Sequence, residues 1–343
     1  MVNKPVRFQR PSGDISGIAR KARLTKLPMT KPMFQQAALI GVGLIGSSLS
    51  HAMRRANLVA RITACARSEA TRATVRNLGL ADEVFEHAAD AVHGADLVIL
   101  CTPVGTFEAI SAEIAPHLKR DAILSDAGSV KTAVIRDVGP HVPEHVHFIP
   151  GHPIAGTEFS GPESGFAELF DGRWTILTPL PDADEKAVAK LKAYWEGCGA
   201  MVEIMTPEHH DLVLAVTSHV PHLIAYNIVG TVSDLERVTE KEVIKFSASG
   251  FRDFTRIAAS DPTMWRDIFM NNKEAVLEIL GRFTEDLAAL QRAIRWGDGE
   301  ALFDLFTRTR AIRRGIIDAG QETPAPDFGR KIPHGNAGPG KTS

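Results

Sequence analysis

The sequence has few cysteines and no long uninterrupted apolar run. Its three cysteines, Cys65, Cys101 and Cys198, are too few and too scattered for a disulfide framework or a zinc cluster. We expect each to be a reduced, buried thiol, which suits a reducing cytoplasm. No uninterrupted apolar run reaches the roughly 18 residues that cross a bilayer. These absences favour a cytoplasmic protein without a membrane segment.

An excess of positive charge is found only at the start of the chain. The first 35 residues carry eight Lys or Arg side chains and one acid, Asp14, which leaves a body of 31 basic and 40 acidic residues with a net charge of −9. A body of this charge does not favour nucleic acid as a partner. We predict that residues 1–36 form a disordered extension, in which Met29 and Met33 are alternative starts, and that the Pro- and Gly-rich residues 320–343 form a disordered tail.

Between residues 37 and 205, short apolar runs alternate with helical stretches. The predicted strands are 37–40, 60–66, 96–102, 122–127, 147–151, 174–179 and 201–205. The predicted helices between them are 46–57, 69–78, 106–118, 131–138 and 185–197. This alternation predicts βαβ units, and so an α/β, Rossmann-like, doubly wound domain with a mostly parallel sheet over residues 37–205.

After Thr206 the strand pattern stops. Long apolar helices are predicted over 207–235, with a kink at Pro221, and over 263–298 and 299–318. Several of these helices are too apolar to face water on both sides. Residues 206–319 are therefore predicted to form an all-α domain that buries one face against a second copy of the chain, as a homodimer.

A glycine-rich turn follows the first predicted strand. In "GVGLIG", Gly41 permits a tight turn, Gly43 lets the backbone approach a pyrophosphate, and Gly46 lets the helix pack on the strand. Leu44 and Ile45 lie between these glycines, where the amino terminus of the helix faces the phosphates. The turn predicts a dinucleotide-binding site.

The second predicted strand lacks the acid that usually binds the ribose hydroxyls of NAD. Arg67 stands near that position, in "CARSEAT". An arginine can accept a 2′-phosphate or stack on adenine, so NADP is plausible, although a solvated Arg67 and NAD binding both stay open. Thr102 and Pro103 end the next strand and are predicted to line the cofactor cleft.

The stretch "GHPIAGTE" places His152 between Gly151 and Pro153 on what reads as a stiff turn. This imidazole could be structural, a metal ligand or a general acid or base. Metal binding is disfavoured, because no cysteine or repeated carboxylate accompanies it. Catalysis is favoured, because imidazole titrates near neutrality and removal of a hydride from a carbinol also releases a proton.

Other polar groups occur where a core would exclude them. Ser129, in "SDAGSVK", either serves the cofactor cleft or caps the helix that follows. His219 and His222, in "TSHVPH", share one helix face as site, zinc or core histidines, whereas His209 and His210 are predicted to face solvent. Arg256 is predicted to bind a small carboxylate, unless it forms an internal salt bridge with Asp253.

In combination, these motifs resemble the prephenate/arogenate (cyclohexadienyl) dehydrogenases of tyrosine biosynthesis. The resemblance covers residues 37–318 and is carried by "GVGLIGSSL", "CTPV", "SDAGSVK", "GHPIAGTE", "TSHVPH" and "GFRDFTRIAASDPTMWRDIF", in that order. It implies an NAD(P)-dependent oxidative decarboxylation of prephenate to 4-hydroxyphenylpyruvate, by a homodimer joined through its helical domain.

The resemblance also implies roles for individual residues. His152 takes the proton of the ring hydroxyl, and Ser129 orients the hydroxyl, the histidine and the nicotinamide. Arg256 holds a substrate carboxylate, His219 and His222 line the pocket, and Asp253 and Trp265 shape its mouth. The choices between prephenate and arogenate and between NAD and NADP stay open, as does feedback inhibition by tyrosine.

Two alternatives remain from the sequence. A β-hydroxyacid dehydrogenase would rely on a lysine in the helical domain, but Lys241 and Lys245 lie in a charged stretch that reads as solvated. A non-catalytic NAD(P)-binding dimer would bind cofactor without turnover, and it would need neither His152 nor Arg256.

Overall fold

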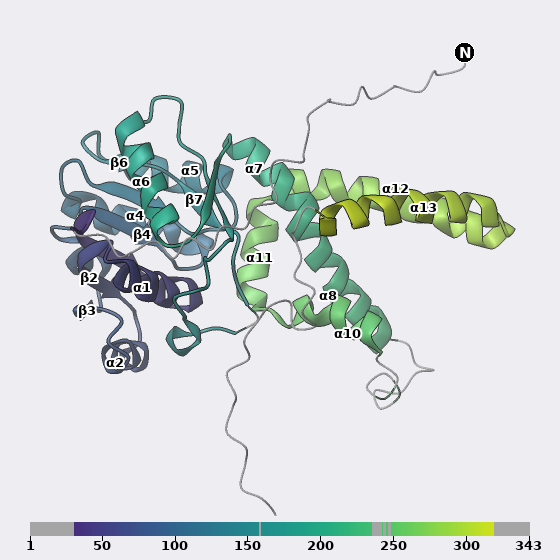
Figure 1. Ribbon diagram of the computed structural model, residues 1–343, viewed down its shortest axis with the longest axis horizontal. Coiled ribbons are helices and arrows are strands. Elements are labelled where there is room, and N and C mark those ends of the chain that lie inside the picture. The colour runs from purple at the N-terminus through teal and green to yellow at the C-terminus, as the bar shows by residue number, and fades with distance from the viewer. Residues whose placement is uncertain (1–30, 158, 235–241, 243–244, 246–247, 319–343) are drawn as a thin grey trace, which may run out of the picture. The chain divides into compact units, whose positions relative to one another are not determined.

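The computed structural model describes residues 31–157, 159–234, 242, 245 and 248–318 (Figure 1). The predictions for residues 1–30 and 320–343 and for Lys241 therefore concern residues outside the described part. The chain divides into two compact units, Lys26–Phe283 and a second unit that contains Thr284–Ser343.

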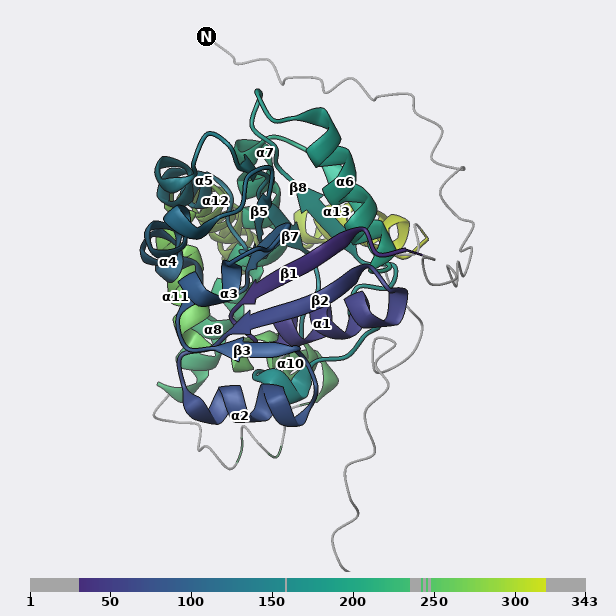
Figure 2. The same cartoon turned by 90° about the vertical axis from the view of Figure 1, so that its left-hand side faces the viewer.

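The first unit contains a six-stranded parallel sheet in the order β3-β2-β1-β4-β5-β6. Figure 2 shows β1, β2 and β3 side by side. Since the strand order reverses between β1 and β4, the doubly wound fold predicted from the sequence is confirmed. The strands are β1 (Phe34–Ile40), β2 (Val59–Cys65), β3 (Glu83–Phe85), β4 (Leu97–Leu100), β5 (Ile123–Asp126) and β6 (His147–Phe148).

Helices connect these strands and cover both faces of the sheet. They are α1 (Leu44–Ala56), α2 (Glu69–Asn77), α3 (Ala88–Val92), α4 (Phe107–Ile114) and α5 (Thr132–Val138). The short β3 and α3 were not predicted. β1 begins at Phe34 rather than at residue 37, so the predicted disordered extension 1–36 is wrong at residues 34–36, which belong to the strand.

Successive side chains of β1 belong to two different hydrophobic clusters, one on each face of the sheet. Ala37 and Leu39 pack with α1 and α6 (Glu185–Gly197), whereas Ala38 and Ile40 pack with α4 and α5. This alternation follows from the two-residue period of a strand that is buried on both faces. The second cluster also contains Trp265 and Ile268 of α11 (Pro262–Asn271), so the helical region is anchored on the sheet.

His152 lies on a strand and not on the tight turn predicted from its glycine and proline neighbours. A second sheet, in the order β7-β8-β9, comprises β7 (Gly151–Pro153), β8 (Trp174–Leu177) and β9 (Met201–Ile204). His152 pairs with Ile176 across the antiparallel β7 and β8. The predicted strand 147–151 is split at Pro150, which has no N–H to continue the ladder of β6.

The helix predicted over 207–235 contains a wider turn. It consists of α7 (Pro207–Leu214), a π turn (Ala215–His219) and α8 (Val220–Ser233). The ring of Pro221 removes one backbone donor and crowds the carbonyl four residues earlier, and the π turn accommodates both effects at the place where a kink was predicted.

The helix predicted over 263–298 is two helices, which corrects that prediction. α11 ends and α12 (Lys273–Trp296) begins on either side of Asn272, whose φ of −117° and ψ of 37° are not helical. Further helices in the described part of this region are α10 (Ser249–Thr255), the short turn η7 (Arg256–Ala259) and α13 (Gly299–Asp318).

One helical run is long and apolar enough, by length and composition alone, to cross a membrane. It is Pro207–Val232, with a mean hydropathy of 1.5 over its best window. The sequence prediction counted only uninterrupted apolar residues and so did not find it. His210, Asp211 and His219 of this run are buried and hydrogen-bonded within the protein, although only 28% of the window is buried.

The anchoring of α11 can be tested by removing its indole. Trp265 is only 6% exposed, so Trp265→Ala is expected to lower the free energy of unfolding by about 3–5 kcal/mol. Phe159→Ala, at an aromatic ring that is 66% exposed, should change it by less than about 1 kcal/mol. Urea unfolding measures both, and equal effects would show that Trp265 does not anchor the helix.

Candidate active site

The three glycines of the turn after β1 have distinct surroundings. Gly41 has a φ of +95°, and a Cβ there would lie 2.6 Å from Cγ2 of Thr102. A Cβ on Gly46 would lie 2.3 Å from the carbonyl oxygen of Gly41. Above Gly43 there is open space, with nothing within 4 Å of a Cβ. The turn is thus closed on the protein side and open where a phosphate would approach.

The amino terminus of α1 is suited to an anion. Gly43 is its N-cap and supplies no side-chain hydrogen bond, and the first turn, which includes Leu44 and Ile45, contains no acid. The first N–H groups of the helix are therefore left without a side-chain cap, and the helix dipole favours a negative charge there. The residues present fit the pyrophosphate of a dinucleotide.

The turn after β2 is held by an arginine that the sequence analysis did not single out. Arg72 is buried and donates to the carbonyl oxygens of Ala66 (2.9 Å) and Arg67 (2.6 Å). It also binds the carboxylates of Glu69 (2.8 Å) and Glu86 (3.2 Å). The side chain of Arg67 itself is exposed. The acids nearest this turn are thus bound to Arg72.

The other predicted cofactor residues, Thr102 and Pro103, lie at the end of a strand next to the glycine turn. Thr102 is half-buried, and its hydroxyl oxygen accepts a hydrogen bond from the Thr106 hydroxyl at 2.8 Å. Pro103 is exposed. Both follow β4, the neighbour of β1, so the structure brings Thr102 against the Gly41 turn.

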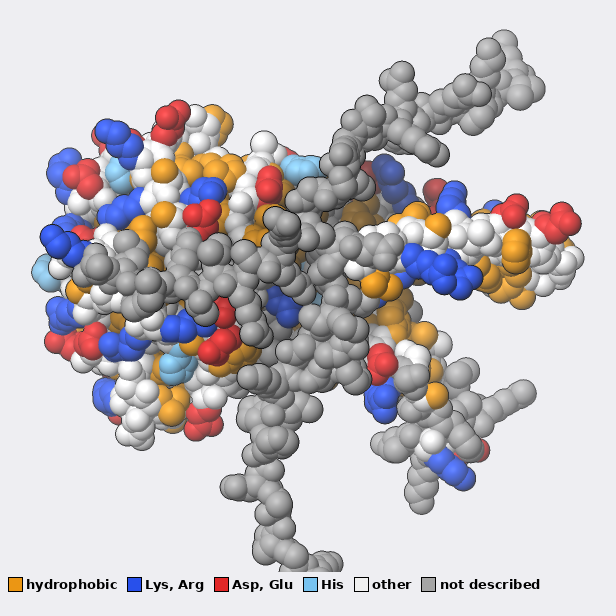
Figure 3. All heavy atoms as spheres, in the orientation of Figure 1, with side chains coloured by type: hydrophobic (Ala, Val, Ile, Leu, Met, Phe, Trp, Pro, Cys, Tyr) orange, Lys and Arg blue, Asp and Glu red, His pale blue; other side chains and the backbone are white. Residues whose placement is uncertain are grey.

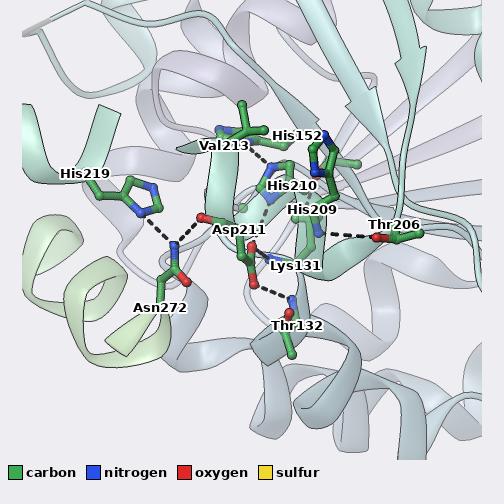
Figure 4. Close-up of polar contacts among 12 residues, drawn as sticks. Lys131, Thr132, His152, Thr206, His209, His210, Asp211, Val213, His219 and Asn272 are labelled. Carbon is green, nitrogen blue, oxygen red and sulfur yellow. Dashed lines mark hydrogen bonds and ion pairs between the residues drawn. The ribbon is translucent and has the colours of Figure 1, made fainter. Parts of the chain in front are cut away.

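His152 contacts a second histidine. Its Nδ1 lies 2.8 Å from Nε2 of His210, and the two rings meet edge to face (Figure 4). His210 lies on α7 and is fully buried, so the prediction that it faces solvent is wrong. His210 and Asp211 lie on the buried side of α7, which is joined to the start of α5 by Asp211, whereas His209 is exposed as predicted.

A buried ion pair holds the backbone beneath His152. Lys131 and Asp126 are both fully buried and in contact. The Lys131 ammonium donates to the carbonyl oxygen of Gly151 (2.6 Å), and Asp126 accepts from the N–H of Gly151 (3.1 Å). Burial raises the pKa of Asp126 and lowers that of Lys131, while their mutual attraction opposes both shifts. The peptide before His152 is therefore bound on both sides.

Asp211 joins the helical region to the sheet region. Its carboxylate accepts from the N–H groups of Lys131 (2.7 Å) and Thr132 (2.9 Å) at the start of α5, and it lies 2.8 Å from Nδ1 of His210. Burial disfavours the charge, but these hydrogen bonds hold the pKa of Asp211 below its usual value. Asp211, and not the hydroxyl of Ser129, caps α5.

His219 and Asn272 extend this network. Asn272 donates through Nδ2 to the carbonyl oxygen of Asp211 (2.9 Å) and lies 3.0 Å from Nδ1 of His219. Burial lowers the pKa of His219 to about 4, and the backbone of the half-buried Ser129 opposes part of that shift. Burial also lowers the pKa of His210 and, well below its ordinary value, that of His152. All three imidazoles are therefore neutral at pH 7.

A second group surrounds Trp265. Its indole stacks on His222, with ring centroids 3.7 Å apart, and meets His219 edge to face at 6.1 Å. Arg256 is half-buried, and its positive charge contributes to the lowered pKa of His222 after the larger effect of burial. Asp253 stands apart, since it is exposed and pairs with Arg252 at 3.4 Å rather than with Arg256.

The structure thus joins His152 to residues that the sequence analysis missed, namely Asp126, Lys131, His210, Asp211 and Asn272. A signal was available for some of them, because Asp126 and Lys131 flank a buried strand end and Asp211 interrupts an apolar helix face. Within the described ranges, no group of three or more His, Cys, Asp or Glu side chains is arranged to hold a metal ion.

Comparisons with known proteins show the family of this chain. Residues 49–204 match the model of the prephenate dehydrogenase nucleotide-binding domain, and residues 206–308 match that of the prephenate dehydrogenase dimerization domain. The chain is 43% identical over 284 residues to the cyclohexadienyl dehydrogenase of Zymomonas mobilis, covering 83% of this chain and 97% of that protein. It is 33% identical over 279 residues to the prephenate dehydrogenase of Bacillus subtilis, covering 81% and 75%.

A solved structure is similar over most of its length. The prephenate dehydrogenase from A. aeolicus, in complex with hydroxyphenyl propionate and NAD+, superimposes with a TM-score of 0.76 at 35% identity, covering 85% of this chain and 99% of that one. These matches, over the parallel-sheet domain and the helical region alike, show that the chain belongs to the prephenate dehydrogenase family.

Proposed function

We propose that this dehydrogenase catalyses the NAD(P)-dependent oxidative decarboxylation of prephenate or arogenate, with His152 as the base. The observation that carries the proposal is a buried, neutral imidazole whose Nδ1 is bound by His210. Such a ring has its second nitrogen, Nε2, available for a substrate hydroxyl. The family relatives named for prephenate and cyclohexadienyl substrates support the same reaction.

The proposed chemistry balances with one base. As hydride leaves the ring carbon that carries the hydroxyl, His152 takes the hydroxyl proton. Loss of the ring carboxylate as CO2 then aromatises the ring, and the proton returns to the phenolic oxygen. Because aromatisation makes the reaction downhill, the protein has mainly to orient the substrate and to hold one proton.

The remaining predicted residues are proposed to bind the substrate. Arg256 holds a carboxylate by paired hydrogen bonds, beside the stacked His222 and Trp265. His219 lines the site next to the backbone of Ser129, whose hydroxyl is proposed to orient the substrate. Asp253, on the surface, is proposed to shape the mouth of the substrate pocket. The buried Trp265 is proposed to shape the same mouth through its contact with His222.

The dinucleotide is proposed to bind at the glycine turn, where it supplies the hydride acceptor. The residues proposed to hold it are Gly41, Gly43, Leu44, Ile45, Gly46, Arg67, Thr102 and Pro103. We favour NADP alongside NAD, because the exposed Arg67 can meet a 2′-phosphate and the nearest acids, Glu69 and Glu86, are bound to Arg72.

The active form is proposed to be a cytoplasmic homodimer. The dimerization-domain match covers 206–308, and α12 and α13 carry large exposed apolar side chains, visible in Figure 3. They include Leu287, Ile294, Trp296, Phe303, Phe306 and Ile312. Covering them with a second copy would remove this apolar area from water. The free thiols Cys65, Cys101 and Cys198 agree with a reducing compartment.

The role of His152 predicts a specific pH dependence. Since the neutral ring is active and burial lowers the pKa of His152, kcat should hold at pH 6.5 and fall only at lower pH. His152→Asn should reduce kcat by roughly 10²–10⁴-fold and abolish this acid limb, whereas His209→Asn should leave both unchanged. A His152→Asn enzyme with the same acid limb at a near-normal rate would rule out the base.

Substrate and cofactor can be tested together. Prephenate and arogenate are each assayed with NAD+ and with NADP+, and turnover is expected in at least one of these four combinations. Arg67→Ala should raise KM for NADP+ several-fold more than KM for NAD+, whereas Arg120→Ala, at an exposed arginine that precedes β5, should alter neither. Cofactor binding without turnover in all four combinations would instead indicate a sensor. Equal effects of Arg67→Ala on both cofactors would remove Arg67 from 2′-phosphate recognition.

The dimer proposal is tested by placing charge on its surface. Trp296 and Phe303 are 74% and 69% exposed, so Trp296→Glu with Phe303→Glu should leave the fold intact and convert a dimer to monomers. Light scattering coupled to size-exclusion chromatography measures the mass, and Leu78→Glu on the nucleotide-binding region serves as control. A double variant that stayed dimeric would place the interface elsewhere.

A further inference from the structure

The hydrogen bonds around His210 have only one consistent set of directions. Asp211 accepts two backbone N–H groups and has a pKa held low, so its carboxylate is an acceptor only. The Nδ1 of His210, 2.8 Å from that carboxylate, must therefore carry a hydrogen. Since burial keeps His210 neutral, its Nε2 has a lone pair and accepts.

The direction of the next bond follows. Nδ1 of His152 lies 2.8 Å from the accepting Nε2 of His210, so Nδ1 of His152 must donate. A neutral imidazole has one hydrogen, and its Nε2 is then left with a lone pair. Free histidine favours the other tautomer, with the hydrogen on Nε2, which could not take a proton at that atom.

We propose that Asp211 and His210 are positioning residues that hold His152 in the Nδ1–H tautomer, with the lone pair of Nε2 directed to the reacting hydroxyl. This inference rests on the proposed function, because it assigns to His152 the proton transfer described there. It adds two residues whose effect on the reaction is exerted through His152.

The proposed chain also explains where positive charge is stabilised during turnover. When Nε2 of His152 takes the substrate proton, the ring becomes an imidazolium, whose charge is disfavoured by burial and by the positive charge of Lys131. The bond from Nδ1 to His210 and on to the Asp211 carboxylate supplies the opposing negative charge. A carboxylate that fixes a tautomer and stabilises an imidazolium in this way contributes up to roughly 10⁴-fold in kcat in other enzymes.

A matched pair of variants at His210 separates positioning from packing. The amide oxygen of His210→Gln can accept from Nδ1 of His152, whereas His210→Phe keeps a ring but offers no acceptor. We expect His210→Phe to lower kcat by roughly 10²-fold or more with little change in KM, and His210→Gln to recover at least a tenth of the wild-type kcat. Equal losses in the two variants, or a loss confined to KM, would overturn the proposal.

Nitrogen-15 NMR of the histidine rings gives a readout that does not depend on activity. At pH 7 the wild-type His152 should show the shifts of a protonated Nδ1 and an unprotonated Nε2. His210→Phe and Asp211→Asn should move it toward the opposite tautomer, while His209→Gln, at the exposed neighbour, should not. A wild-type His152 that carried its hydrogen on Nε2 would refute the inference.

The two proposals can fail separately. If His152→Asn kept the acid limb and a near-normal rate, the base role would be lost even with the tautomer as expected. If His152→Asn were inactive but the NMR showed the other tautomer, the base role would stand and the positioning role of Asp211 and His210 would fall. Should Asp211→Asn not fold, because Asp211 also caps α5, the His210 pair tests the same chain without touching that cap.

Discussion

The carboxylate of Asp211 is the interaction on which the site most depends. It caps α5, which follows a strand of the parallel sheet, while its own residue lies on α7 at the start of the helical region. A third bond goes to His210, which in turn contacts His152. One side chain thus fixes the first helical element against the sheet and the second histidine against the first, so the geometry of the site follows from the way the two regions are joined.

The buried ion pair of Asp126 and Lys131 supports the same site by binding the backbone of the residue before His152. Withdrawing two charges from water is costly, and replacing such a pair with apolar side chains is often neutral or stabilising for a fold. Its retention here is explained by what it binds, because both side chains are bonded to the backbone of Gly151. Among the described strands β7 lies at the edge of its sheet and pairs with β8 alone, so the residue before His152 gains support from this ion pair.

Much of the architecture could be predicted from sequence periodicity. The alternation of apolar runs and helices gave the parallel sheet, and the order of motifs gave the family. The end of a helix at Asn272 and the burial of His210 were not predictable from periodicity, because they arise from single side chains in tertiary contacts. Asn272 interrupts a regular helical pattern since its amide is needed between Asp211 and His219. His210 reads as solvent-facing next to His209, because two adjacent histidines at a helix start give no indication of which side the sheet will cover.

The π turn at Ala215–His219 has a consequence for how this helix can vary. It inserts one residue relative to a regular α-helix, and each residue of an α-helix turns the chain by about 100°. Deleting a single residue from the turn would straighten the run and rotate everything beyond it by that angle about its axis. His219 and His222 would then leave the faces from which they reach Asn272 and Trp265. Related chains with the same histidine spacing should therefore conserve the number of residues between Asp211 and His219 more strictly than the residues themselves.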